Sequence, residues 1–279
     1  MSDQPLSQRN DNRSHRPTSP AFRAFMSEGW AASDFATPSR SAAADFAAER
    51  RERLAARFPG ERLIVPAGIP RVRSNDTDFR FRPHSAFAHL TGLGTDREPE
   101  AVLVLEPVDD GGHEPVLYIR PAAGKDTSEF YADSRYGEFW VGRRPTLSEI
   151  ATTTGIRTEH VDGLRDALAK DAGPGAVSLR VIRAADEAVT EMVDEIRTQA
   201  GLPPSSALPG DDLGPDGALE EAASEARLVK DDYEISEMRL AVAASIRGFE
   251  RVVRALPRAV GAERGERVVE SAFELDARV

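Results

Sequence analysis

The chain has 279 residues, of which 40% are hydrophobic and 30% are charged, with a formal net charge of −11 and no cysteine. The acidic balance argues against binding to nucleic acid or to an anionic membrane, since both need a basic surface. The absence of cysteine excludes disulfides, thiolate nucleophiles and cysteine-ligated zinc.

Residues 1–43 are predicted to be a disordered N-terminal segment, because the polar opening MSDQPLSQRNDNRSHRPTSP would bury too little apolar surface to offset the entropy lost on ordering. The opening also lacks the apolar core of a signal peptide, and no run approaches the roughly 20 apolar residues of a membrane span. A cytoplasmic protein is expected. A short apolar island follows, made of Phe22, Phe25, Met26 and Trp30. It is interpreted as a strap packed on the domain surface or, alternatively, as a partner-binding segment.

An α/β domain is predicted from residue 44 to residue 200, because helical and strand patterns alternate there. The first helix starts near Ala44 and is closed by Pro59-Gly60. One side of it carries Phe46, Arg50, Leu54 and Phe58. Short apolar strands are predicted at Leu63–Ala67, Val102–Leu105 and Val116–Ile119. Gly111-Gly112 indicates a hairpin turn between the last two strands.

The second half of this domain is predicted to contain more helix. Thr146 and Glu149 have the spacing of a capping box, which would open a short helix through about Thr153. Helices are expected over 161–170 and 185–200, with a strand over 177–182 between them. The last helix would turn Val189, Met192, Val193 and Ile196 inward.

Residues 201–224 are predicted to be a linker, since they are rich in Pro, Gly, Ser and Asp and show no periodicity. Asp231 then begins an amphipathic helix that is expected to end at Pro257. Its apolar stripe comprises Ile235, Met238, Val242, Ile246, Phe249, Val253 and Leu256. A second helical pattern runs from about Ala262 to Val279 without a stop signal, and this is interpreted as a truncation.

No catalytic centre is visible from the residue patterns alone. His84 and His89 are five residues apart, which places them off a common helical face and on opposite faces of a strand, so structural or solvent-exposed histidines are the preferred interpretation. Acidic pairs such as Asp109-Asp110 are explained by turns and helix starts. The sequence has no GxSxG motif, no phosphate-cradling glycine loop and no plausible Ser/His/Asp order.

Four segments resemble, in the same order, the Xaa-Pro aminopeptidases (aminopeptidase P), the proline-specific branch of the pita-bread metallopeptidases. They are RSNDTDFRFR at 73–82, TGL…EPEAVLVLEP at 91–107, EFWVGRR at 138–144 and EARLVKDDYEI at 225–235. The resemblance covers roughly Phe46 to Val279. It implies that 44–200 is an α/β domain with a mixed sheet flanked by helices, and that 225–279 is the incomplete start of a pita-bread catalytic domain.

The resemblance also implies a function. Members of the family release the first residue of peptides with proline second, using two manganese ions held by two Asp, one His and two Glu. A bridging hydroxide attacks the bond before proline. None of those five ligand positions is present in this sequence, so the chain alone is expected to bind no metal and to be inactive. Proline-containing peptides and a homo-oligomer of the full-length form are the partners that the resemblance implies.

Two residues are site candidates by resemblance. Asp76 aligns with an acidic position near the mouth of a neighbouring subunit's active site, and Trp140 aligns with an aromatic near the same mouth. Asp76 could bind a basic group or a substrate amine, or be an ordinary turn aspartate. Trp140 could wall a proline-accepting cleft, where a rigid apolar face suits the ring, or be a core or interface tryptophan.

Two alternative functions remain open at this point. A Xaa-Pro dipeptidase (prolidase) of the same family would differ in catalytic-domain residues, and a non-catalytic protein could keep the domain for oligomerisation or peptide binding. The sequence also leaves open whether the gene continues past Val279, which first residue the substrate carries, the oligomeric state and the role of 1–43.

Overall fold

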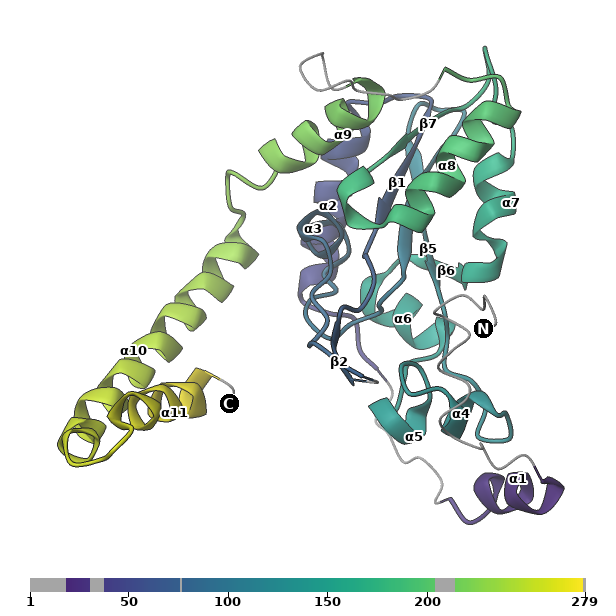
Figure 1. The fold of residues 1–279 in the computed structure, drawn as a ribbon. Coiled ribbons are helices and arrows are strands. Elements are labelled where there is room, and N and C mark those ends of the chain that lie inside the picture. Colours follow the sequence, from purple (N-terminus) through teal and green to yellow (C-terminus); the bar gives the residue numbers. More distant parts are fainter. Residues whose placement is uncertain (1–18, 31–37, 76, 204–213, 278–279) are drawn as a thin grey trace, which may run out of the picture. The chain divides into compact units, whose positions relative to one another are not determined.

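A computed structural model describes residues 19–30, 38–75, 77–203 and 214–277. The chain divides into two compact units, Met1–Ala226 and Arg227–Val279 (Figure 1). Residues 1–18 and 31–37 of the segment predicted to be disordered lie outside the described ranges.

The first unit is built on a five-stranded mixed sheet with the order β6-β5-β4-β1-β7. Its strands are β1 (Glu61–Pro66), β4 (Val102–Pro107), β5 (His113–Ile119), β6 (Arg157–His160) and β7 (Ser178–Val181). β4 runs antiparallel to both β1 and β5, whereas β7 is parallel to β1 and β6 is parallel to β5. The predicted strands and the hairpin at Gly111-Gly112 are confirmed, and β6 is an additional edge strand.

Helices cover both faces of this sheet, as Figure 1 shows. One face packs against α2 (Ala43–Ala55), α3 (Ser85–Thr91), α6 (Leu147–Thr154) and α9 (Gly214–Glu225). The other packs against α7 (Leu164–Ala169), which follows a 3-10 turn at Val161–Gly163, and α8 (Glu187–Gln199), which follows one at Arg183–Ala185. Successive strand residues alternate between the two cores: Leu63 and Val65 of β1 face the first, and Ile64 faces the second. The predicted α/β class, a mixed sheet between helices, is confirmed.

Two buried arginines of α2 hold the end of α3. Nη1 of Arg50 donates to the carbonyl oxygen of His89 at 3.0 Å, and Nη1 of Arg51 donates to that of Leu90 at 2.7 Å. Cationic donors at a helix C-terminus satisfy carbonyls that have no partner within the helix and oppose its dipole. At the other end of α3, the ring of His84 accepts from the backbone N–H of Ala86. The short helix therefore depends on side chains at both ends.

The expected linker over 201–224 differs from the structure. Residues 204–213 lie outside the described ranges, but Gly214–Glu225 form helix α9. Leu219, Ala222 and Ala223, spaced three and one apart, are buried in the first core. The prediction was wrong for Gly214–Glu225. The nearby Pro and Gly residues favoured a linker, whereas the helix is stabilised by packing of its few apolar residues against the sheet, which the local sequence does not indicate.

Part of the segment predicted to be disordered is also ordered. Pro20–Ser27 form α1, which Ser19 caps by accepting from the N–H of Phe22. The ring of Phe22 lies edge-on to Tyr131 at 5.5 Å, and that of Trp30 lies edge-on to Phe130 at 5.0 Å. These partners belong to α4 (Glu129–Ala132). The apolar island is thus a strap on the surface of the first unit.

The second unit is a pair of helices, α10 (Asp232–Val260) and α11 (Gly265–Ala277). Asp231 begins α10 as expected, and together with Glu234 it forms a capping box. The expected helix end at Pro257 is wrong by three residues, because α10 continues to Val260. The fixed φ of proline is helical, so the last turn can follow Pro257 although this residue removes one N–H and its ring crowds the carbonyl four residues earlier. The helices meet where Gly248 leaves room for the ring of Phe273; a Cβ there would lie 2.9 Å from that ring. None of the described helices is long and apolar enough to cross a membrane.

Candidate functional site

Four parallel strands of the sheet, β1, β5, β6 and β7, end at one edge, which we call the carboxyl edge. Two long connections meet there: residues 67–101 between β1 and β4, and residues 120–146 between β5 and α6. Segments 73–82, 91–101 and 138–144, singled out in the sequence, all lie in these connections. In open α/β sheets, ligands bind outside the carboxyl ends of strands. This edge is therefore the candidate site.

Ion pairs link the two connections to each other, and another ion pair lies within the first connection. Asp78, on the short hairpin of β2 (Val72–Ser74) and β3 (Thr77–Asp78), receives two hydrogen bonds from Arg135, at 2.8 and 3.0 Å. Within the first connection, Nε of Arg80 donates to Asp96 at 2.8 Å. The bidentate Asp78–Arg135 pair spans the two connections and fixes their relative position.

The same two connections also contain a buried acid and a buried arginine. The Glu98 carboxylate is 4.0 Å from the Arg144 guanidinium, and both side chains are buried. Arg144 also donates to the carbonyl oxygen of Arg120 and lies over the Tyr136 ring at 5.2 Å. Burial raises the pKa of Glu98 above its ordinary range, although the nearby charge of Arg144 opposes the shift.

The backbone between residues 96 and 100 is strained. Asp96, Glu98 and Glu100 have φ values of 59°, 41° and 62°, in the left-handed region that non-glycine residues seldom adopt. Glu98 also precedes Pro99, which disfavours helical backbone of this kind. Such conformations cost about 1–3 kcal/mol each and cluster at functional sites. This loop is a second reason to place the candidate site at the carboxyl edge.

Of the two residues predicted from the sequence, Asp76 lies outside the described ranges. Trp140 lies on α5 (Glu138–Val141) at the carboxyl edge and is 55% exposed, which excludes a core tryptophan. Its indole Nε1 donates to the carbonyl oxygen of Tyr131 at 2.8 Å, so the ring is held in place while its surface remains open. Other large apolar side chains that are exposed in the two connections are Ile69, Val72, Phe79, Phe139 and Val141.

The strap lies beside this tryptophan. The ring of Trp30 is 6.1 Å from that of Phe139, which in turn is 6.3 Å from Trp140. Sequence reasoning found the strap as an apolar island but did not connect it to α4 and α5. No local pattern could have done so, because the contact joins residues about a hundred positions apart.

Replacing Trp30 with alanine is expected to release α1 and to speed tryptic cleavage after Arg23. Each edge-on aromatic contact contributes about 0.5–1.5 kcal/mol, so losing the contacts to Phe130 and Phe139 should raise the open population about tenfold. Timed proteolysis followed by mass spectrometry measures the rate. Phe25→Ala is the matched control, since Phe25 also belongs to the strap, lies on α1 itself and is 73% exposed. Equal rates for the two variants would contradict docking through Trp30.

The described residues do not fit a metal pair. No group of three or more His, Cys, Asp or Glu side chains in the described ranges lies close enough together to hold a metal ion. The acids of the carboxyl edge are instead engaged by arginines, as in Asp78–Arg135 and Asp96–Arg80. Two manganese ions, which the sequence resemblance implies, have no ligand set in this part of the chain.

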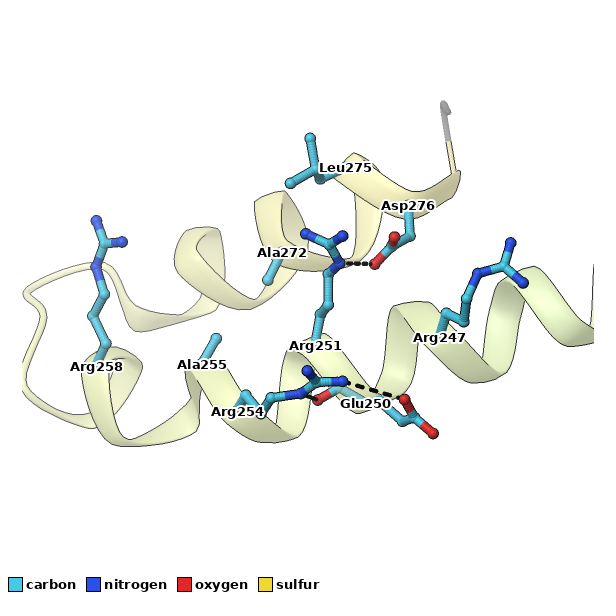
Figure 2. A pocket seen from close by; sticks show the side chains of 9 residues that line it. All are labelled: Arg247, Glu250, Arg251, Arg254, Ala255, Arg258, Ala272, Leu275 and Asp276. Atoms are coloured by element: carbon cyan, nitrogen blue, oxygen red, sulfur yellow. Dashed lines mark hydrogen bonds and ion pairs between the residues drawn. The ribbon is translucent and has the colours of Figure 1, made fainter.

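A pocket of about 650 Å³ in the second unit also lacks catalytic groups (Figure 2). Its charged lining consists of Arg247, Arg251, Arg254, Arg258, Glu250 and Asp276. Arg251 of α10 pairs with Asp276 of α11, and Arg254 pairs with Glu250 at 3.2 Å, as the dashed lines in Figure 2 mark. No His, Ser or Tyr lines this pocket, and its two carboxylates, Glu250 and Asp276, are both paired with arginines, so neither is placed as a general base.

Comparison with known proteins relates the chain to one family. Residues 47–177 match the family model described as "Aminopeptidase P, N-terminal domain". Xaa-Pro aminopeptidase 1 of Streptomyces coelicolor is 37% identical over 99% of this chain and 51% of its own length. Xaa-Pro aminopeptidase 2 of the same organism is 38% identical over 98% of this chain and 53% of its own length. The chain thus spans about half the length of these relatives.

The fold matches as well. Proline aminopeptidase P II from Yersinia pestis superposes with a TM-score of 0.61 at 22% identity, covering 82% of this chain and 49% of that structure. Because the sequence identity is only 22%, the superposition establishes similarity of fold alone.

Proposed function

Because the chain belongs to the aminopeptidase P family through its N-terminal domain at residues 47–177, we propose that it is the N-terminal part of a metal-dependent Xaa-Pro aminopeptidase. Such an enzyme releases the first residue of peptides that carry proline in second position. The support is that relatives bearing this name match nearly the whole chain, 99% and 98% of it. The proposal includes a cytoplasmic location and a homo-oligomer of the full-length enzyme.

The observation that carries the proposal is the exposed, fixed indole of Trp140 at the carboxyl edge. A proline ring packs well on a rigid aromatic face, and this ring is anchored through Nε1 while 55% of the residue stays exposed. In the proposed enzyme, Trp140 walls the proline-accepting part of a cleft in a neighbouring subunit. Asp76, which falls in the connection of residues 67–101 rather than in that of Trp140, is proposed to bind the substrate amine.

The chemistry of bond cleavage is assigned to a different part of the enzyme. A metal pair, when bound, supplies a hydroxide near neutral pH. Since the described residues do not fit such a pair, its ligands are proposed to lie in a catalytic domain equivalent to the remaining half of the relatives. What this chain contributes is a domain that positions the carboxyl edge against substrate.

The purified chain is expected to hydrolyse no Xaa-Pro peptide, with or without added manganese. The physical reason is that nothing in the described ranges can lower the pKa of a bound water. Release of free amino acid from peptides such as Xaa-Pro-Ala measures the activity. Manganese-dependent release by the chain alone would contradict the proposal that the metal ligands lie elsewhere.

A chimaera tests whether this chain can serve as the N-terminal part of an active Xaa-Pro aminopeptidase. Fusing this chain to the second half of Xaa-Pro aminopeptidase 1 from Streptomyces coelicolor should give hydrolysis, and Trp140→Ala should raise its KM about 3- to 10-fold. Phe25→Ala, another exposed aromatic, is the control and should leave KM unchanged. Peptide binding without cleavage would favour the non-catalytic alternative.

A further inference from the structure

The pocket between α10 and α11 is lined by more positive than negative charge, although the whole chain has a net charge of −11. Its two carboxylates, Glu250 and Asp276, are already paired with the two inner arginines of the lining. Arg247 and Arg258 form no ion pair and no side-chain hydrogen bond within the described ranges. Figure 2 shows these two arginines at opposite ends of the pocket. Two positive charges without a counter-charge therefore remain there.

All the arginines of this pocket lie on one side of α10. Their spacing of four, three and four residues follows the helical turn, and at about 100° per residue it places them away from the apolar side chains of Ile246 and Val253. Like charges at such spacings destabilise a helix. A local arrangement that lowers helix stability is expected where a functional surface requires it. The arginines therefore indicate a surface for an anionic partner.

Part of the same lining is apolar. It consists of Ala255 on α10 and of Ala272 and Leu275 on α11. Leu275 is 56% exposed, so apolar surface is accessible beside the arginines. An aliphatic side chain would remove this surface from water, whereas a phosphate chain has no group that could do so. The apolar lining favours a peptide over a polyphosphate.

The length of the pocket excludes a small anion as the ligand of both free arginines. Arg247 and Arg258 are eleven positions apart, which corresponds to about 16 Å along α10. An extended peptide advances about 3.3 Å per residue, so about five residues span this distance. The planar guanidinium group can bind a carboxylate through two parallel N–H donors. Carboxylates near both ends of a short extended peptide therefore match the two free arginines.

We propose that the pocket between α10 and α11 binds an extended acidic segment of a partner protein, with an aliphatic side chain between its carboxylates. Arg247 and Arg258 pair with carboxylates near the two ends of the segment. The two inner arginines donate through N–H groups that a single carboxylate leaves free, since a guanidinium has five donors. The aliphatic side chain packs against Leu275. This binding involves no metal and does not depend on the proposed peptidase activity.

Fluorescence anisotropy of a labelled Glu-Glu-Leu-Glu-Glu peptide, titrated with the purified full chain at low ionic strength, tests the site. We expect saturable binding that weakens as salt is added, because exposed charges carry it. The peptide with Gln in place of Glu should bind at least about tenfold more weakly, and the one with Ser in place of Leu about 3- to 10-fold more weakly. No saturable binding, equal binding of these peptides, or tighter binding of inorganic tripolyphosphate would overturn the proposal.

Variants locate the binding. Combining Arg247→Gln with Arg258→Gln removes two exposed charges that hold no other group in the described ranges, and it should weaken binding about tenfold or more. Arg264→Gln with Arg267→Gln is the matched control, because these exposed arginines of the same unit do not line the pocket. Leu275→Ser should weaken binding of the leucine peptide but not of the serine peptide. Equal affinities of the two double variants, or equal effects of Leu275→Ser on both peptides, would contradict the proposal.

Discussion

Replacing Arg197 with methionine is expected to lower the free energy of unfolding of the first unit by about 3–5 kcal/mol. Arg197 of α8 and Asp216 of α9 are 3% and 1% exposed in their side chains. Nη1 and Nη2 of Arg197 donate to the two oxygens of Asp216 at 2.9 and 2.5 Å, and Nη2 also donates to the carbonyl of Leu179 at 2.7 Å. Methionine would leave a buried carboxylate without its main partner.

The pair is the centre of a network that fastens α9 to the sheet. Asp216 also accepts from the N–H of Val181 in β7 at 2.9 Å and from Arg183 at 3.0 Å. Arg183 and Arg197 both donate to Asp194. Because α9 buries Leu219, Ala222 and Ala223 in the first core, loss of the network should destabilise the whole unit rather than fray one helix.

Urea unfolding followed by circular dichroism measures the change. Arg165→Met is the matched control: Arg165 pairs with Glu195 of the same helix as Arg197, but the two side chains are 46% and 58% exposed. An exposed pair contributes about 0–1 kcal/mol. If the two variants lose similar amounts of unfolding free energy, burial does not determine how much the Arg197–Asp216 pair stabilises the first unit.

The pH dependence gives an independent check of the same pair. Burial by itself would raise the pKa of Asp216, but the hydrogen bonds and charge of Arg197 outweigh it and lower the pKa below its ordinary value. A carboxyl with a lowered folded-state pKa stabilises fully above the unfolded value of about 3.9 and loses this contribution as pH falls through the folded value. The unfolded state is common to both proteins, and loss of Arg197 raises the pKa of Asp216 in the folded variant. The difference between the wild type and Arg197→Met should therefore shrink as pH falls from the raised pKa of the variant to the lowered pKa of the wild type.

Elements with a clear local pattern could be predicted from the sequence. The apolar runs of β1, β4 and β5 and the capping boxes at Thr146 and Asp231 are local signals, and the structure has them. β6 could not be predicted in this way. Its residues, Arg157–His160, are polar, and the strand exists because the backbone of β5 offers an unpaired edge.

The candidate site was less accessible to sequence reasoning. Trp140 could be selected by resemblance, but its exposure and its hydrogen bond to Tyr131 depend on how α4 and α5 pack. The Asp78–Arg135 pair joins residues 57 positions apart, so only the topology of the sheet brings them together. The buried Glu98 looked like any loop glutamate. Its neighbour Pro99 was a local signal of unusual backbone, but it gave no indication of burial.

Replacing Ile246 and Val253 with serine is expected to turn a self-associating second unit into one that stays monomeric in the full chain. Val242, Ile246 and Val253 are 58%, 55% and 64% exposed along one side of α10. The ring contact between α10 and α11 is made by Phe249 and Phe273, at 5.2 Å, so the serine variant leaves it intact. A contiguous apolar stripe of this length usually recruits a partner or aggregates. Sedimentation velocity at several concentrations measures the change.

The control for the stripe is an exposed leucine on the other side of the same helix. Leu240 is 62% exposed but lies on the opposite side of α10 from Ile246 and Val253, because six and thirteen residues at about 100° per residue turn it away from them. Leu240→Ser should therefore leave association unchanged. If it reduces association as much as the double variant does, general hydrophobicity and not the stripe drives the contact. Because the substitutions lie in the second unit, urea unfolding of the Met1–Ala226 unit should not change in either variant.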